Sequence, residues 1–136
     1  MLELSVAARE HFEHPRNAGA LEPSEPDMVE ARVGEPVSGD VLQLHLRIDG
    51  QGIIVAVRFK AYGCGWLIAC GSLLTECLEG RTLAEAGHFR HRELVEKLDV
   101  PPAKLHCAVL AETALKAALR AFVAKSTPAT LPNPIP

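Results

Sequence analysis

The chain has 136 residues, of which 48% are hydrophobic and 23% charged, and its formal net charge is −3. This length fits one domain with a single hydrophobic core, and this composition is ordinary for a globular protein. The weak negative charge and the single tryptophan and single tyrosine argue against a surface that binds nucleic acid or an anionic membrane. Apolar runs are far shorter than the roughly 20 residues that span a bilayer, and charges interrupt the N-terminal apolar pattern, so we expect a cytoplasmic protein.

The first part of the chain predicts a helix, a loop and a strand. Apolar residues spaced among charges over 2–13 predict a short amphipathic helix that Pro15 ends. The apolar residues of this helix are Leu2, Val6, Ala7 and Phe12. The stretch 14–27 is rich in turn-forming residues and is predicted as loop, and 28–33 is predicted as the first strand.

Two alternating segments predict an antiparallel β-hairpin with one buried face. Residues 41–48 and 53–60 each alternate along the chain, and DGQG at 49–52 forms the turn between them. The residues predicted to line the buried face are Leu42, Leu44, Leu46 and Ile48 in the first of these strands, and Ile53, Val55, Val57 and Phe59 in the second.

Beyond Gly65 the apolar period changes from two to three or four residues, which predicts helices. The first helix ends at Gly80, a second covers 91–98, and a third runs from 105 to about 125 after the proline pair of 100–104 breaks the chain. The residues that space these helices are Leu67, Cys70, Leu74, Cys77 and Leu78, then Leu94, Val95 and Leu98, then Leu105, Val109, Glu112, Leu115, Leu119 and Phe122.

The order of these elements indicates the fold class. Strands that precede helices predict an α+β fold with one sheet and one helical layer. We therefore predict a single domain over 1–125. The segment 126–136 contains four prolines and few residues that can pack, so we predict a loose tail.

Cys64 lies between two glycines at the predicted junction of strand and helix. The first amides of a helix and its dipole favour negative charge, so we expect this thiol to have a lowered pKa and to be a better nucleophile or metal ligand. The glycines leave room for a bulky ion or a partner near the backbone. From the sequence alone, a buried structural cysteine explains the position equally well.

Cys107 repeats this arrangement in the first turn of the last predicted helix, directly after His106. At a first turn both side chains can face one site, and a thiolate beside an imidazole suits zinc or iron. Asp40 begins a strand and matters only if its loop meets the two cysteines in space. The four-coordinate metal set would then be Asp40, Cys64, His106 and Cys107. The alternative is a turn aspartate, core cysteines and a surface histidine.

The remaining cysteines and histidines are predicted to be structural or solvated. Cys70 and Cys77 lie on the apolar face of one helix, which favours core packing for both. His45 alternates onto the other face of its strand, so we expect it to be exposed. The histidines predicted as solvated loop residues are His88 and His91, and those that could reach a neighbouring site are His11 and His14.

Four segments carry a family resemblance: HPRNAG (14–19), VGEPVSGDV (33–41), RFKAYGCGWLIACGSLLTE (58–76) and VPPAKLHCAVLAE (100–112). They are similar, in this order, to H/N-P-R-N-x-G, to G-x-P-x-C-G-D, to F-x-x-x-G-C-x-x-x-x-A-S-x-S, and to L-P-P-V-K followed by H-C-x-x-L-A-E. These are motifs of the IscU/NifU family of iron–sulfur cluster assembly scaffolds, which the chain resembles from about residue 6 to residue 124.

The resemblance implies a three-stranded antiparallel sheet packed against helices, and a scaffold that is not an enzyme. Such a scaffold transiently binds iron and sulfide, or a nascent cluster of the [2Fe–2S] type, and passes it to acceptor proteins. Matched by position, the metal ligands are Asp40, Cys64, His106 and Cys107. The family's first ligand cysteine is replaced here by Ser38, a poor ligand for soft metals. Sulfur delivered by a cysteine desulfurase could then be accepted by Cys107 or Cys64, and not by Ser38.

Several interpretations of Ser38 stay open. The four other ligands hold a weaker or altered cluster, or the serine was introduced in place of a natural cysteine. Alternatively the chain is a diverged paralogue that holds zinc or no metal and modulates a cysteine desulfurase as an interaction module. Cys70 could replace the missing ligand only if its helix unwinds. A hydrolase with Cys107 as nucleophile and His106 as base ranks last, because adjacent residues rarely reach the required geometry.

The chaperone motif departs from the family pattern as well. The resemblance implies contact with an Hsp70-type chaperone through Val100, Pro101, Pro102, Ala103 and Lys104. The family has leucine and valine where this chain has valine and alanine. These smaller residues would fill a peptide groove less well, by ~0.8 kcal/mol for each methylene that is no longer buried.

Overall fold

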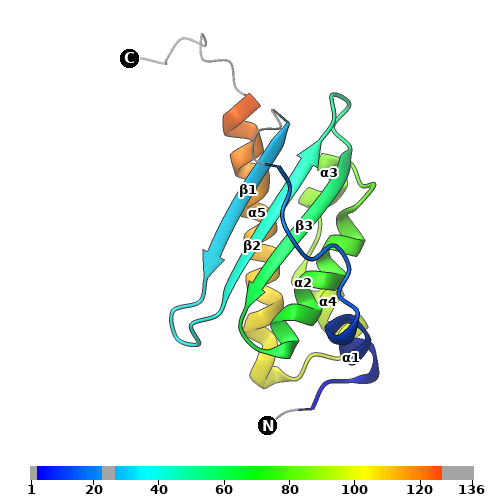
Figure 1. The fold of residues 1–136 in the computed structure, drawn as a ribbon, viewed down its shortest axis with the longest axis vertical. Coiled ribbons are helices and arrows are strands. Elements are labelled where there is room, and N and C mark those ends of the chain that lie inside the picture. Colours follow the sequence, from blue (N-terminus) through cyan, green and yellow to red (C-terminus); the bar gives the residue numbers. More distant parts are fainter. Residues whose placement is uncertain (1–2, 23–26, 127–136) are drawn as a thin grey trace.

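The alternating segments of the sequence form a three-stranded antiparallel sheet, and α2 and α5 cover one of its faces (Figure 1). The computed structural model describes residues 3–22 and 27–126. Its elements are α1 (Val6–Glu13), β1 (Met28–Gly34), β2 (Val41–Ile48), β3 (Ile54–Tyr62), α2 (Gly65–Leu78), α3 (Leu83–Gly87), α4 (His91–Leu98), the 3₁₀ turn η1 (Pro102–Lys104) and α5 (Leu105–Ser126). The predicted α+β fold is confirmed, and the predicted tail lies almost entirely outside the described residues.

The central strand β2 has the buried face that the sequence predicts. Its register pairs Leu44 with Ala31 of β1 on one side and with Phe59 of β3 on the other. All three side chains are buried against the helices. Removing a leucine side chain from water contributes roughly 1.5–3 kcal/mol, so a row of such residues holds the sheet to the helical layer. The buried row of β2 is Leu42, Leu44, Leu46 and Ile48.

A β-bulge changes the buried face of β3 near its start. Arg47 pairs with Ala56, but the next residue of β2, Ile48, pairs with Ile54, which leaves Val55 as the extra residue. Side chains alternate along a strand, so one extra residue moves the residues before it to the opposite face. Ile54 is therefore fully buried and Val55 is 38% exposed. The predicted inward row is right from Val57 onward and wrong before the bulge.

Small residues let the two covering helices approach the sheet closely. A Cβ on Gly71 of α2 would lie 2.6 Å from the ring of Phe59, so only glycine fits at this crossing. Leu105 and Val109, the first apolar residues of the spacing that predicted α5, are 43% and 40% exposed. A stripe of small residues determines which side of α5 faces the sheet, because small side chains allow the shortest distance between helix and sheet. The stripe is Cys107, Ala108, Ala111, Ala114 and Ala118.

The first helix begins later than predicted and buries a different face. Ser5 is its N-cap, because the side-chain oxygen accepts a hydrogen bond from the backbone N–H of Ala8 at 3.0 Å. The helix packs on α2 through the small Ala8 and through His11, which makes a polar contact there. The predicted face residues that are exposed are Val6, Ala7 and Phe12, and the prediction for Leu2 lies outside the described residues.

The segment after α1 crosses the outer face of the sheet, in front of β3 in Figure 1. It pairs with β3 through Phe59, whose N–H donates to Asn17 O at 3.0 Å and whose carbonyl accepts from Gly19 N at 2.8 Å. The N–H of Leu21 then donates to His45 Nδ1 at 2.9 Å. His45 is only 5% exposed, so the prediction of an exposed histidine is wrong. The crossing segment covers it, which strand alternation cannot indicate.

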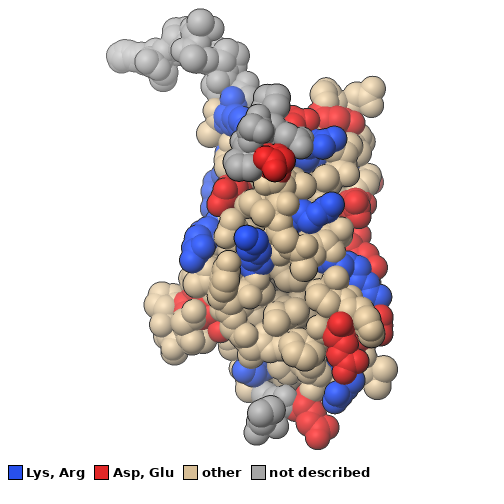
Figure 2. All heavy atoms as spheres, viewed as in Figure 1, with Lys and Arg blue, Asp and Glu red and all other residues tan. Residues whose placement is uncertain are grey.

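Charged side chains of both signs lie over the outer face of the sheet (Figure 2). There Glu30 lies 3.6 Å from the imidazole of His45, and Arg47 lies 3.7 Å from the carboxylate of Asp27. Within residues 3–22 and 27–126, no helix is both long enough and apolar enough to cross a membrane.

The region between α2 and α5 contains one helix that the sequence analysis did not predict. α3 begins with a capping box, in which Thr82 Oγ1 accepts from Glu85 N at 3.1 Å and Glu85 Oε1 accepts from Thr82 N at 2.9 Å. This T-x-x-E spacing is a sequence signature of a helix start. His88 is exposed as predicted, but His91 is the first residue of α4 and is bonded to Glu112, so its prediction as a solvated loop residue is wrong.

Candidate metal centre

Three segments that lie far apart in the sequence meet at one end of the sheet, where the β1–β2 loop and the starts of α2 and α5 come together (Figure 1). Asp40 ends the loop, and Cys64 is the N-cap of α2. His106 and Cys107 lie in the first turn of α5. The structure therefore brings these four side chains into one neighbourhood. That they bind a metal stays a prediction.

Asp40, His106 and Cys107 form the tightest part of this group. His106 Nε2 lies 3.2 Å from Asp40 Oδ2 and 3.6 Å from Cys107 Sγ, and Cys107 Sγ lies 3.8 Å from Asp40 Oδ2. Tetrahedral metal bonds of about 2.0–2.3 Å place neighbouring ligand atoms roughly 3.3–3.8 Å apart. The spacing of the three donor atoms therefore suits a single metal ion between them, as their mutual distances below 4.8 Å indicate.

Cys64 adds a second sulfur beside Cys107. The two Sγ atoms lie 3.8 Å apart. The backbone of Cys64 is extended, with φ −81° and ψ 174°, and its side chain makes no capping hydrogen bond to the helix. Cys107 is fully buried, whereas Cys64 is only partly buried. The group thus presents one sulfur toward solvent and keeps the other inside.

Burial determines the properties of the Cys107 thiol. The sequence predicts a lowered pKa for a thiol at such a helix start, but burial raises the pKa of Cys107 far above its usual range, and the neighbouring Cys64 adds to the effect. The prediction is wrong for Cys107 because a buried thiolate loses more solvation than the helix end returns. A bound cation reverses this penalty, since metal binding favours the thiolate and releases the proton.

The glycines around Cys64 make room for residues of the chain itself. A Cβ on Gly63 would lie 2.5 Å from Asp40 Oδ1, so glycine alone lets the carboxylate approach the start of α2. A Cβ on Gly65 would lie 3.3 Å from the ring of Phe12, which packs there from α1. The sequence analysis expected these glycines to admit an ion or a partner. Their closest neighbours are instead the carboxylate of the candidate centre and an aromatic side chain.

Ser38 is exposed and bonded within its own loop. Its Oγ accepts a hydrogen bond from Asp40 N at 3.1 Å, and its N–H donates to Glu35 Oε1 at 2.7 Å. Glu35 also accepts from Val37 N at 3.3 Å. The hydrogen bonds from Ser38 lower the pKa of the Glu35 carboxyl. The serine therefore holds the turn that precedes Asp40.

The two other cysteines differ in their burial. Cys70 is fully buried, as predicted, and burial raises its pKa to about 12, with a smaller contribution from the charge of Cys64. Cys77 is only partly buried, so its predicted core position is confirmed in part. Cys70 therefore packs in the core behind the candidate centre, and Cys77 lies farther along α2.

The segment predicted to contact a chaperone joins α4 to α5. Val100 is buried, and its N–H donates to Val95 O at 3.1 Å. Pro102 and Ala103 are exposed in η1, and the break in the chain between the two helices is confirmed. The sequence analysis expected Val100 to fill a groove on the chaperone, but this side chain belongs to the core.

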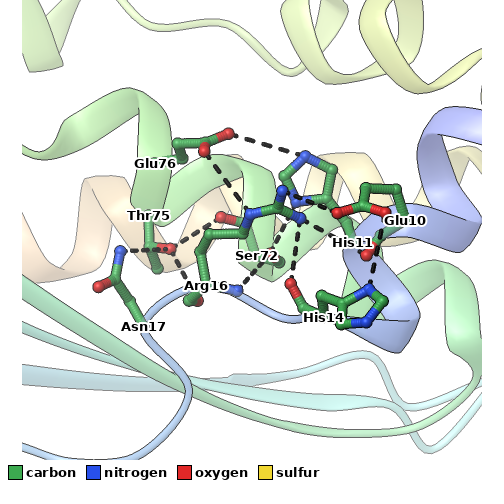
Figure 3. Close-up of polar contacts among 8 residues, drawn as sticks. All are labelled: Glu10, His11, His14, Arg16, Asn17, Ser72, Thr75 and Glu76. Atoms are coloured by element: carbon green, nitrogen blue, oxygen red, sulfur yellow. Dashed lines mark hydrogen bonds and ion pairs between the residues drawn. The ribbon is translucent and has the colours of Figure 1, made fainter.

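A second polar cluster, which we call the α1–α2 network, joins the N-terminal segment to α2 (Figure 3). At its centre, Ser72 Oγ accepts a hydrogen bond from Arg16 N at 2.8 Å and lies 2.7 Å from His11 Nδ1. Ser72 Oγ is therefore the shared partner of His11 and of the backbone of Arg16. The residues of the network are Glu10, His11, His14, Arg16, Asn17, Ser72, Thr75 and Glu76.

The edge of the α1–α2 network consists of ion pairs and a second hydroxyl. The guanidinium of Arg16 lies 3.0 Å from a Glu10 oxygen and 3.7 Å from a Glu76 oxygen. Thr75 Oγ1 donates to Ser72 O at 2.7 Å and accepts from Asn17 Nδ2 at 3.2 Å. The network thus fixes the H-P-R-N segment on α2. The sequence analysis missed it, although hydroxyl residues inside an otherwise apolar helix are a signal of such contacts.

The histidines of α1 contribute to this network rather than to the candidate centre. Burial, followed by the charge of Arg16, lowers the pKa of His11, so this buried imidazole is held neutral. His14 is exposed and lies 3.6 Å from Glu10. His11 reaches Ser72 of α2, while His14 pairs within its own helix, so the site that His11 reaches is this network.

Glu112 ties α4 to α5. Its Oε1 accepts from His91 N at 2.7 Å, and its Oε2 lies 2.7 Å from Lys116 Nζ. Burial of Glu112 opposes ionisation, but the hydrogen bonds from Lys116 and His91 prevail and lower its pKa to about 2. This contact holds α4 against α5, the helix whose first turn carries His106 and Cys107.

Comparisons with known proteins agree in one family. A profile of the family described as "NifU-like N terminal domain" matches residues 5–129. The chain is 45% identical over 116 residues to the iron-sulfur cluster assembly scaffold protein IscU of Haemophilus influenzae, covering 85% of this chain and 92% of that protein. It is 48% identical over 113 residues to the protein of the same name from Azotobacter vinelandii, covering 83% and 88%.

A solved structure supports the same fold. The chain is similar to the N-terminal part of a nitrogen-fixing NifU-like protein from Brucella abortus, with a TM-score of 0.72 over 90% of this chain and 95% of that chain. The two sequences are 19% identical, so this likeness concerns the fold.

Proposed function

Since the chain belongs to the NifU-like N-terminal domain family, we propose that it is an iron–sulfur cluster assembly scaffold. It binds iron and sulfide, or a nascent cluster, as cargo and passes them to acceptor proteins. The single observation that carries this proposal is the convergence of one carboxylate, one imidazole and two thiols from one loop and two helix starts at one end of the sheet. Donors in such a mixed set suit iron and zinc.

The proposed ligands divide into a buried part and an open part. Cys107 and Asp40 are buried, while His106 and Cys64 are partly exposed. Cargo held in this way is anchored from inside and reachable from outside, which suits transfer better than permanent storage. We propose a [2Fe–2S] cluster as the form of the cargo, because two sulfurs and two further donors match the four protein ligands of such a cluster.

The sulfur of the cluster requires an acceptor on the scaffold. We propose that a cysteine desulfurase delivers it to Cys64 or Cys107, of which Cys64 is the more exposed. Ser38 lacks a thiol and cannot take part. We assign no catalytic turnover to the chain. A Cys–His hydrolase has less support, because the same ring nitrogen, His106 Nε2, lies next to both Cys107 Sγ and Asp40 Oδ2, whereas a catalytic base uses one nitrogen for the nucleophile and the other for its orienting carboxylate.

One observation favours a second candidate function. The hydroxyl of Ser38 is bonded within its loop, so the donors left for a metal are two sulfurs, one nitrogen and one oxygen. The donor atoms of Asp40, His106 and Cys107 all lie within 4.8 Å of one another, and Cys64 Sγ, 3.8 Å from Cys107 Sγ, would have to turn toward them to become the fourth ligand of a single zinc ion. In this alternative the chain holds zinc and modulates a cysteine desulfurase as an interaction module. Metal analysis of the purified protein separates the two candidates.

A chaperone contact and a cytoplasmic location stay predictions. For the chaperone we propose that the exposed residues Pro102 and Ala103 make the contact, because Val100 is buried in the folded protein. Binding of a peptide that spans Val100 would require local unfolding between α4 and α5.

The test of the scaffold proposal is anaerobic reconstitution with iron, sulfide and a thiol reductant, followed by visible absorption. We expect a cluster spectrum from the protein as it is and a higher yield or longer lifetime from Ser38→Cys. Val37→Cys is the matched control, because it adds a thiol one residue away on the same loop at a side chain that is 94% exposed. No spectrum from either the protein or Ser38→Cys, together with bound zinc after purification, would support the alternative.

A further inference from the structure

We propose that Cys64 and Cys107 are a redox-active dithiol, which forms an internal disulfide by exchange with a small disulfide such as glutathione disulfide. In the oxidised form both sulfurs are withdrawn from the candidate centre. The thiol chemistry stands on the geometry of the two cysteines, and only its consequence for cargo rests on the proposed function.

The two sulfurs are already neighbours. Cys64 Sγ and Cys107 Sγ lie 3.8 Å apart, and a disulfide requires ~2.05 Å. Cys64 precedes the first residue of α2 and makes no capping hydrogen bond with its side chain, so rotation of that side chain breaks no helix contact. We infer that rotation of the Cys64 side chain brings the two sulfurs to bonding distance.

The pair is asymmetric in a way that suits exchange. Cys64 is partly exposed and can meet a small disulfide from solvent, whereas Cys107 is fully buried behind it. In dithiol pairs of this kind the accessible thiol forms the mixed disulfide and its neighbour resolves it. Here the buried sulfur lies next to the sulfur that it must attack.

The chemistry needs no reactant beyond the small disulfide. Cys64 attacks one sulfur of glutathione disulfide, a bond forms between Cys64 Sγ and that sulfur, and one glutathione leaves as a thiol. Cys107 Sγ, whose hydrogen is directed at Asp40 Oδ2 at 3.8 Å, then gives up its proton as it attacks Cys64 Sγ, and the second glutathione leaves and takes up a proton. Two protein thiols are oxidised to one disulfide, glutathione disulfide is reduced to two glutathiones, and the two thiol protons end on the two glutathiones.

Because position 38 is a serine, the loop before Asp40 offers no third thiol to this pair. The loop before Asp40 carries a hydroxyl at this position, bonded to Asp40 N, so no loop thiol competes for Cys64. Cys70 is as buried as Cys107, but it lies inside α2, and the sulfur that lies 3.8 Å from Cys64 Sγ is that of Cys107. Cys77 lies two helical turns beyond Cys70 along α2, away from the helix start that carries Cys64. Exchange at Cys64 is therefore directed to Cys107.

The test uses the full chain, freed of metal and incubated without oxygen with glutathione disulfide. We expect a mass lower by two hydrogens without a glutathione adduct, and a crosslinked peptide that contains Cys64 and Cys107. In Cys107→Ser the glutathione adduct on Cys64 should accumulate, roughly tenfold above its level in the unchanged protein. Cys77→Ser is the matched control and should form the internal disulfide as the unchanged protein does.

Two results would overturn the proposal: a stable glutathione adduct on Cys64 in the unchanged protein, or a crosslink that contains Cys70 or Cys77. Reconstitution of the reduced protein with iron and sulfide, run beside this test, reports on the proposed function separately. A cluster without the disulfide refutes the dithiol alone, and the disulfide without a cluster refutes the scaffold function alone. Zinc bound before oxidation should suppress the disulfide, because it occupies both thiolates.

Discussion

The candidate metal centre and the α1–α2 network both place polar side chains against α2, but their contacts differ. In the network, Ser72 Oγ lies 2.7–2.8 Å from its two partners, which are the distances of strong hydrogen bonds. In the centre, the donor atoms of His106, Cys107 and Asp40 lie 3.2–3.8 Å apart. The groups of the network satisfy one another closely, while the longer spacing in the centre, two of whose three distances involve sulfur, suits the ion that we propose it binds.

From this difference we expect the α1–α2 network to contribute to stability and the candidate metal centre to contribute to binding. Buried polar groups that are paired stabilise a fold, because an unpaired one costs free energy. Donor atoms spaced for a metal gain their main interaction only when the ion is present. Substitutions in the two regions should therefore separate stability from metal affinity.

Cys107→Ser should produce the largest effect on binding. Loss of this central ligand should weaken zinc affinity by at least ~100-fold, more than the 10–100-fold typical of an outer-shell change. The measurement is competition with a chromophoric zinc chelator. Cys77→Ser should bind as the unchanged protein does. Equal affinity in Cys107→Ser and the unchanged protein would remove Cys107 from the ligand set and end the contrast between the two regions.

Ser72→Ala should produce the largest effect on stability. It leaves His11 and the N–H of Arg16 without their shared partner, so the free energy of unfolding should fall by about 1–3 kcal/mol in urea. Thr113→Ala, which removes an exposed hydroxyl on α5, should change it by less than ~0.5 kcal/mol. Zinc affinity should stay unchanged in Ser72→Ala. A marked loss of affinity would show that the network also positions the centre.

The pH dependence of stability should sharpen the comparison further. Burial lowers the pKa of His11, so below pH 6.5 the unfolded chain binds a proton that the folded chain does not, and stability falls as the pH drops. His11→Gln should reduce this fall by at most ~1 kcal/mol between about pH 7 and pH 5. Some dependence should remain, because burial lowers the pKa of His45 as well. Urea unfolding at several pH values measures it, and an unchanged slope would contradict a neutral His11.

Arg9→Ala should have the smallest effect. Arg9 pairs with Glu13 at 3.8 Å on the exposed side of α1, away from the network. Exposed pairs of this kind contribute little, so we expect less than ~0.5 kcal/mol in thermal or urea unfolding and no change in zinc affinity. A loss above ~1 kcal/mol would mean that the stabilising contacts of α1 extend beyond the residues of the network.

Strand alternation predicted most of the sheet and failed at the start of β3 and at His45. The inward row of β2 follows from its spacing, since each residue has a partner on both sides. The row of β3 changes face at Val55, because the bulge depends on the geometry of the turn and on Ile54 entering the core. An apolar run such as Ile53–Ile54–Val55 fits either register, so its side chains alone could not decide.

Helix spacing had a similar limit. It correctly placed α4 and α5, but α5 buries its alanines instead of Leu105 and Val109. Which side of a helix faces a sheet depends on the shape of the sheet surface, and the spacing of residues within the helix does not contain that information. The buried His45 has the same explanation, because a segment distant in the chain covers it.

The sequence by itself determined the order of strands and helices and the residue types able to bind a metal, because periodicity and side-chain chemistry are local properties. Only the tertiary structure decided that Asp40, Cys64, His106 and Cys107 meet, that Cys107 is buried, and that the hydroxyl of Ser38 is bonded within its own loop. Distances between loops and loss of solvation arise from packing across the whole chain, and no short stretch of sequence contains them.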